Sequence, residues 1–218
     1  MKISPYLVLI LFILTASCGS SQQETVDSLP LKVAAAYGLD RFDEINEIHY
    51  TWNVRRDSAN VISRSWVWNP PSGEVTYTGP DTTLSYSLDE RDSTLDDIDS
   101  RFVNDKYWLL FPFQLAWDTG YDYEVSENEA APISGEPATK LTIVYNNEDG
   151  YTPGDAYDLY LDDQHQIKEW VFRRGNGPDG RAMTWENVQD YEGLQIAMDH
   201  RDDQGNLVLW FSDVKVER

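Results

Sequence analysis

The sequence has one cysteine, few basic residues and no apolar run long enough to cross a membrane. A single cysteine excludes an internal disulfide. Lysine and arginine number 17 against 38 aspartates and glutamates, which gives a formal net charge of -21. Nucleic-acid-binding proteins are basic, and anionic membranes attract basic surfaces. The charge balance therefore argues against nucleic acid as a partner and against electrostatic adhesion to lipid, and it favours solubility through self-repulsion.

The residues that catalysis or metal binding would need are also scarce. None of the three histidines, His49, His165 and His200, has a second histidine at a ligand spacing such as His-x-x-x-His. No Gly-x-Ser-x-Gly elbow is present to supply an activated serine. We therefore expect no catalytic residue, no metal site and no cofactor, with the histidines solvated or at the edge of the core.

Two further patterns are weak. Residues 175–180 match the Gly-x-Gly-x-x-Gly dinucleotide fingerprint, but they fall between two strand patterns and contain Pro178, which favours a hairpin loop. The acidic pairs Asp155 and Asp158, or Asp202 and Asp203, could serve as the two carboxylates of a hydrolase. Such pairs arise by chance among 38 acids, and hydrolysis is the third of our functional alternatives.

The N-terminus has the pattern of an export signal. Lys2 precedes an apolar run from Tyr6 to Leu14, which is too short for the roughly 20 residues of a transmembrane helix. Small residues then lead to Cys18, as in a bacterial lipobox, although Thr15 stands where a leucine is usual. We predict a signal peptide over residues 1–17, lipidation of Cys18, a flexible tether over residues 18–28 and a single domain over residues 29–218. An ordinary secretory signal cleaved nearby is the alternative.

The remaining chain reads mainly as short strands. Ser28 and Pro30 can start a helical segment that Gly38 divides in two. From Ile48 the apolar residues alternate with period two, and short turns separate the strands, which requires antiparallel pairing. We predict four strands before residue 90 and seven after residue 120, near residues 121–125, 138–146, 155–161, 167–174, 182–190, 193–200 and 207–216.

Between the two groups of strands lies the most apolar run of the domain, Asn104 to Trp117. Thr94 can cap a helix that runs into it, and Pro112 must break or kink that helix. We predict a mainly β protein of the α+β type. Its strongly curved antiparallel sheet, or unclosed barrel, has about eleven strands, and two helical segments cover the concave face.

Two segments carry a resemblance to a known family. The run from Phe102 to Leu115 and the run from Tyr151 to Asp162, followed by Ile167 to Trp170 and by Trp185, are similar to a family of uncharacterised bacterial lipoproteins. That family resembles the LolA/LolB-like lipoprotein carriers in fold. The resemblance covers roughly residues 30–216 and implies an exported protein with an apolar concavity. It implies no catalytic residues.

The aromatic residues are the candidate ligand-binding residues. The chain has 8 Trp, 13 Tyr and 7 Phe, and those of the strands and of the apolar run could line the concavity. The residues concerned are Trp66, Trp68, Trp108, Phe111, Phe113, Trp170, Phe172 and Trp185. We predict a non-enzymatic lipoprotein of the bacterial cell envelope, facing the periplasm, held to a membrane by its acyl chains, that binds a lipid or acyl chain. The alternative is a structural module with a filled core and an envelope protein as partner.

Overall fold

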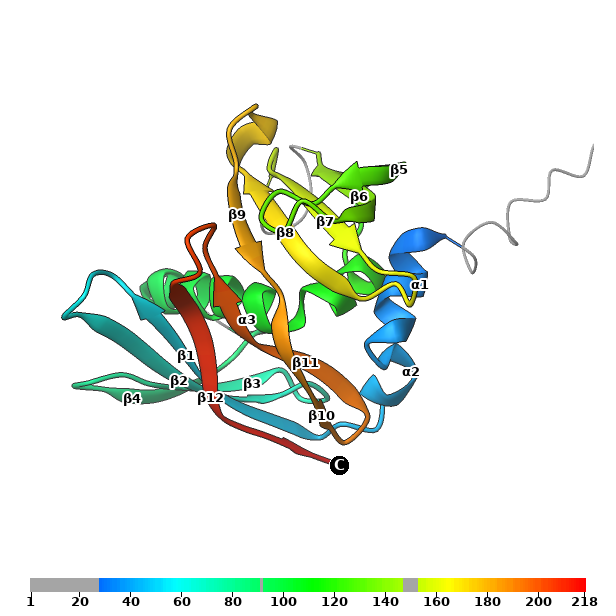
Figure 1. Cartoon of the computed structure of the whole chain (residues 1–218). Helices are drawn as coiled ribbons and strands as arrows, with labels where there is room; N and C mark the ends of the chain where they lie inside the picture. The colour runs from blue at the N-terminus through cyan, green and yellow to red at the C-terminus, as the bar shows by residue number, and fades with distance from the viewer. Residues whose placement is uncertain (1–27, 91, 147–152) are drawn as a thin grey trace, which may run out of the picture.

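The computed structural model describes residues 28–90, 92–146 and 153–218. In this part of the chain twelve strands, all paired antiparallel, form two sheets (Figure 1). The predicted signal peptide, Cys18 and nearly all of the tether lie outside the described residues. None of the described helices is long and apolar enough to span a membrane.

The larger sheet has seven strands in the order β10-β11-β12-β1-β2-β3-β4. The predicted alternation is confirmed in β1, whose inward residues Ile48, Tyr50 and Trp52 are buried. Its strands are β1 (Glu47–Arg55), β2 (Val61–Asn69), β3 (Glu74–Thr78), β4 (Thr83–Ser87), β10 (Glu186–Tyr191), β11 (Leu194–Arg201) and β12 (Leu207–Glu217).

The smaller sheet has five strands in the order β5-β6-β7-β8-β9. Its central strand β7 is buried at all six positions, because both faces are covered. Its strands are β5 (Tyr121–Ala130), β6 (Pro137–Tyr145), β7 (Ala156–Leu161), β8 (Ile167–Arg173) and β9 (Arg181–Thr184). The fingerprint-like residues 175–180 connect β8 to β9, so the predicted hairpin loop is confirmed.

One bent stretch of chain joins the two sheets. Trp185 alone separates β9 from β10. Its amide still donates to the carbonyl of Lys168, in β8, at 2.8 Å, whereas the next residue already pairs with β11. Residues 181–191 are therefore a single bent strand that leaves one sheet and enters the other. The predicted eleven strands become twelve at this bend, and the edge strands β4 and β5 do not pair with each other in the described chain, so no barrel closes.

Two short helices precede the sheets, α1 (Leu29–Ala36) and α2 (Leu39–Phe42). Helix α1 follows Ser28 directly, with Pro30 in its first turn, although the Ser28 side chain makes no capping bond. Gly38 separates α1 from α2, as predicted, with φ of 94°. A side chain there would collide with the carbonyl oxygen of Gly193, which explains the glycine.

Helix α3 (Asp96–Trp117) lies between the two sheets (Figure 1). The Phe102 ring packs 5.3 Å from Trp66 of the larger sheet, and the Phe111 ring packs 5.2 Å from Trp170 of the smaller one. The predicted kink is present: Leu110, two residues before Pro112, leaves helical geometry with φ of -122° and ψ of 21°. Leu110, Phe111 and Phe113 have no exposed surface. The segment 104–117 is therefore a plug within the core.

Two local predictions were wrong. Thr94 does not cap α3. The Asp92 carboxylate instead accepts from the Thr94 amide and starts a 3-10 turn, η1 (Ser93–Leu95), that leads into the helix. Strand β5 continues to Ala130, through residues predicted as a loop, because a bulge with Asn128 at φ of 58° keeps its pairing with β6.

Candidate functional site

A cavity of about 650 Å³ opens beside the C-terminal end of α3. We call it the α2–α3 cavity. Its size is within the range of small-molecule sites. Its walls come from α2 and the residues after it, the end of β2, the β2–β3 turn and α3. The lining residues are Phe42, Asp43, Ile45, Trp68, Pro70, Pro71, Lys106, Gln114, Trp117 and Asp118.

Three aromatic rings form the apolar wall of the α2–α3 cavity. Phe42 lies 4.5 Å from Trp117 and 6.0 Å from Trp68, measured between ring centroids, and the two indoles lie 6.5 Å apart. Edge and tilted contacts of this kind hold the rings in place. The sequence places these residues far apart, and only the packing of α2 and α3 against β2 brings them together.

Three of the lining residues carry nitrogen groups, Lys106, Gln114 and Trp68. The Lys106 ammonium lies 5.2 Å from the centre of the Trp68 ring, and burial lowers the pKa of this lysine while the charge of Asp118 opposes that shift. The Gln114 side-chain amide and the Trp68 indole N–H are buried and meet no acceptor among the described residues. Buried donors without acceptors cost free energy, and these two nitrogens have almost no surface open to the cavity, so a ligand oxygen would reach them only after side-chain rearrangement.

The Asp118 carboxylate is bonded to two tyrosines of the core. Its carboxylate accepts from the Tyr107 hydroxyl at 2.5 Å and from the Tyr145 hydroxyl at 2.7 Å. Burial and the negative charge of Asp118 both raise the pKa of these two tyrosines, so both hydroxyls keep their protons and donate. Asp118 is therefore a structural acceptor that anchors the end of α3.

A smaller cavity, of about 350 Å³, lies on the other side of α3, against β7 to β9. We call it the α3–β8 cavity. Trp108, Trp170 and Phe172 give it an apolar wall, and Arg174 and Arg181 stand at its edge. Trp108 and Trp170 pack with ring centroids 4.5 Å apart.

Behind this cavity the core contains a cluster of nitrogen-bearing rings. Trp185 lies 5.3 Å from Trp170 and 4.6 Å from His200. The Nδ1 of His200 donates to the Thr184 carbonyl at 3.0 Å. The indole nitrogens and the His200 Nε2 meet no hydrogen-bond partner among the described residues. Burial lowers the pKa of His200 to about 4, so the ring is neutral.

The eight predicted ligand-binding aromatics fall into three groups. Trp68 lines the α2–α3 cavity, whereas Trp108, Trp170 and Phe172 line the α3–β8 cavity. The others are buried and line neither cavity: Trp66, Phe111, Phe113 and Trp185. Phe42, Gln114 and Trp117 also line the α2–α3 cavity, and the sequence did not indicate them, because contacts between segments distant in sequence bring them there.

Three carboxylates of the acidic pairs form structural bonds. Asp158 forms an ion pair with Arg173, at 2.8 Å, and accepts from Thr142, while Asp155 accepts from the Gly175 amide. Asp202 closes its own turn by accepting from the amides of residues 204 and 206. These carboxylates are engaged in structural bonds.

Comparison with known proteins gives similarity of fold. No family model and no curated protein matches the chain. A solved DUF1329 family protein from Desulfovibrio piger aligns with a TM-score of 0.47 and 10% identity, over 87% of this chain and 93% of the other. A LolA superfamily protein from Nitrosomonas europaea aligns with a TM-score of 0.42 and 12% identity, over 85% of this chain and 92% of the other. A LolA superfamily protein is thus among the solved structures similar to this chain, and the similarity is in the path of the chain alone.

Proposed function

We propose that this protein is a non-enzymatic binding protein that takes a lipid or acyl chain into the α2–α3 cavity. The observation that carries the proposal is the combination of an aromatic wall, of Phe42, Trp68 and Trp117, with the unsatisfied donors of Trp68 and Gln114. An acyl chain gains about 0.8 kcal/mol for each buried CH₂ group. A carbonyl or carboxylate oxygen at its head would accept from the two donors once side chains around the opening rearrange to expose them.

The proposal places the ligand beside α3. Residues Leu109 to Phe113 are sealed between the two sheets, so a ligand beneath the segment would have to displace the core. Trp117 and Lys106, in contrast, meet the cavity at the accessible end and along the flank of the helix. Binding then requires only rearrangement of side chains around the opening.

The test is native mass spectrometry of the detergent-free protein, together with titration of a fluorescent fatty acid. Three variants with matched substitutions locate the site: Trp117→Ala in the α2–α3 cavity, Trp108→Ala in the α3–β8 cavity, and Trp210→Ala, whose half-buried indole packs on Arg55 of the outer sheet surface. We expect W117A alone to weaken binding, by about tenfold or more. If the protein carries no bound lipid and does not bind the fatty acid, the proposal is wrong. If W108A alone loses fatty-acid binding, the ligand binds in the α3–β8 cavity instead.

The membrane anchor is a separate part of the proposal. Cys18, at the end of the signal-like N-terminus, would carry the acyl chains and hold the domain to a membrane of the cell envelope, with the domain in the periplasm. Cys18→Ser should move the protein from the membrane fraction to the soluble fraction. Retention of the variant in the membrane would contradict lipidation.

One observation favours a second candidate, a protein-interaction module. The concave side of the bent sheet is filled by α3, and β5 forms an uncovered sheet edge on which Tyr123 and Val125 are 45% and 44% exposed. An edge strand of this kind can pair with a strand of a partner. In that case the fatty-acid titration gives no binding, and a charged substitution such as Val125→Lys abolishes a cross-linked complex in the cell envelope.

A further inference from the structure

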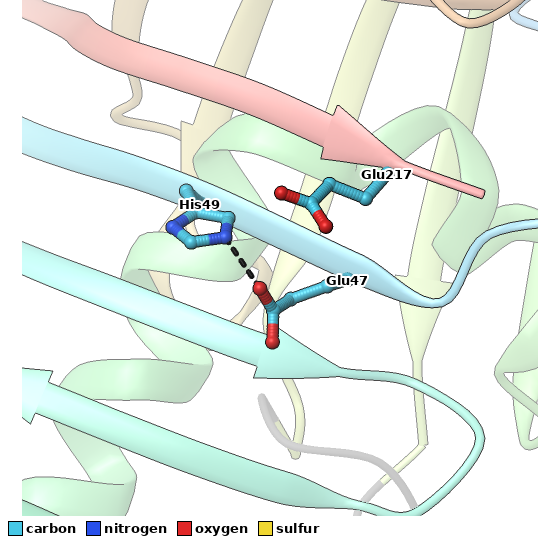
Figure 2. Close-up of side chains that lie close together, drawn as sticks. All are labelled: Glu47, His49 and Glu217. Carbon is cyan, nitrogen blue, oxygen red and sulfur yellow. Dashed lines mark hydrogen bonds and ion pairs between the residues drawn. The ribbon is translucent and has the colours of Figure 1, made fainter.

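Three side chains that can bind a metal meet at the end of the β1–β12 pair (Figure 2). Glu47 and His49 are two residues apart on β1, so they lie on the same face of the strand. Glu217 is directly opposite Glu47 on β12. One carboxylate oxygen of each glutamate and one ring nitrogen of His49 lie within 4.8 Å of one another.

The donor set fits a divalent transition metal better than calcium or magnesium. The Nε2 of His49 lies 2.6 Å from Oε1 of Glu47, and all three side chains are reachable from solvent, at 31% exposure for His49, 34% for Glu47 and 42% for Glu217. An imidazole with two carboxylates is a familiar zinc donor set, whereas calcium and magnesium take oxygen ligands alone. Three protein ligands leave room for water at the fourth position.

The spacing is close to that of a bound ion. Zinc with ligands at about 2.1 Å in a tetrahedron holds its ligand atoms roughly 3.4 Å apart. The His49–Glu47 pair is closer than this and the widest pair, at up to 4.8 Å, is farther apart. Rotation of the Glu47 side chain can widen the first distance and rotation of the Glu217 side chain can shorten the second, without any movement of the strands.

The local charges favour a cation at this place. Glu47 and Glu217 stand opposite each other on adjacent strands, an arrangement in which like charges repel. The Lys215 ammonium contacts the Glu217 carboxylate and relieves part of this repulsion. Lys215 is thus the natural competitor of a bound metal.

We propose that Glu47, His49 and Glu217 bind a divalent transition-metal ion, with zinc as the best fit, at the outer surface of the β1–β12 pair. The site is independent of the proposed lipid binding, because none of its residues lines the α2–α3 cavity. A bound ion would join two neighbouring strands of the larger sheet and displace Lys215 from Glu217.

The test is calorimetric titration of the EDTA-treated protein with zinc chloride. We expect one ion per chain, at least about tenfold weaker binding in His49→Ala and in Glu217→Gln, and tighter binding in Lys215→Gln, because its competing charge is gone. His165→Asn is the matched control, because it removes a histidine outside the site. His165 lies in a turn at φ of 61°, which asparagine also adopts. The zinc affinity of this variant should equal that of the unchanged protein.

Several results would overturn the site. These are the absence of zinc binding by the unchanged protein, equal affinities in it and in H49A, or no gain of affinity in K215Q. Far-ultraviolet circular dichroism of the metal-free variants verifies that each is folded. If H49A fails to fold, E217Q decides the outcome, since its shape is that of the glutamate it replaces.

Discussion

Asp105 is a buried charge whose environment shows how strongly one residue can matter. Its carboxylate has no exposed surface, and it accepts from Arg64 through two nitrogens, at 2.6 and 2.7 Å, from Trp66 at 2.9 Å and from Asn104 at 2.9 Å. The Arg64 guanidinium also stacks on Trp52, at 4.1 Å from the ring centre. The ion pair therefore fixes α3 to β2 and β1.

We predict that Asp105→Ala lowers the free energy of unfolding by about 3–5 kcal/mol, because it leaves the largely buried Arg64 charge without its partner. Urea denaturation measures the change. Arg101→Ala is the control, since it breaks an exposed pair with Asp97 of the same helix and should cost about 0.5 kcal/mol or less. A loss in D105A no larger than in R101A would contradict the role of the buried pair.

His200 should make stability depend on pH. Its folded-state pKa is about 4, against 6.5 for an exposed histidine, so the unfolded chain binds the proton at a pH where the folded chain does not. Stability is therefore lost as the pH falls from about 6.5 towards 4, by roughly 3 kcal/mol from this group. The comparison is with His200→Asn, which keeps a donor near the Thr184 carbonyl. Urea denaturation across this range should show a steeper loss in the unchanged protein, and parallel curves would contradict the assignment.

At the scale of elements, α3 decides whether the concavity is a site or a core. The sequence predicted its apolar residues, its kink at Pro112 and its position between two groups of strands. It could not predict burial on both sides, because the helix pattern shows which residues are apolar and not how many layers cover them. Phe102 packs on one sheet and Phe111 on the other, and the strand that bends at Trp185 joins these two sheets.

We predict that the backbone amides of residues 106–115, apart from Pro112, which has no amide hydrogen, exchange hydrogen only through global unfolding. Their side chains are packed between two sheets, so no partial opening exposes them without breaking the core. The internal reference is β5, a largely exposed edge strand whose amides should exchange through local opening. Hydrogen exchange resolved by NMR measures both. Exchange of α3 at a free energy well below that of global unfolding would identify it as a lid.

At the scale of the molecule, the sequence predicted the class and most strand positions, because alternation and turn residues are local signals. It predicted an apolar concavity, but neither the two cavities beside α3 nor the proposed metal-binding cluster. The α2–α3 cavity joins Phe42, Trp68 and Trp117, and the cluster joins His49 to Glu217, through strand order and register. Spacing along the chain does not indicate which distant residues become neighbours in the fold, so these contacts could not be predicted from one sequence.

The two sheets depend on each other for their stability. They share the bent strand 181–191, and α3 packs against both, so neither sheet retains a covered core if the other unfolds. We therefore predict one cooperative unfolding transition for residues 29–218. Tryptophan fluorescence and far-ultraviolet circular dichroism should give coincident urea curves, and the slowest amides of β2 and of β7 should report the same free energy. Two separate transitions, or a β7 limit several kcal/mol below that of β2, would mean that the smaller sheet opens independently, and the α3–β8 cavity would then widen with it.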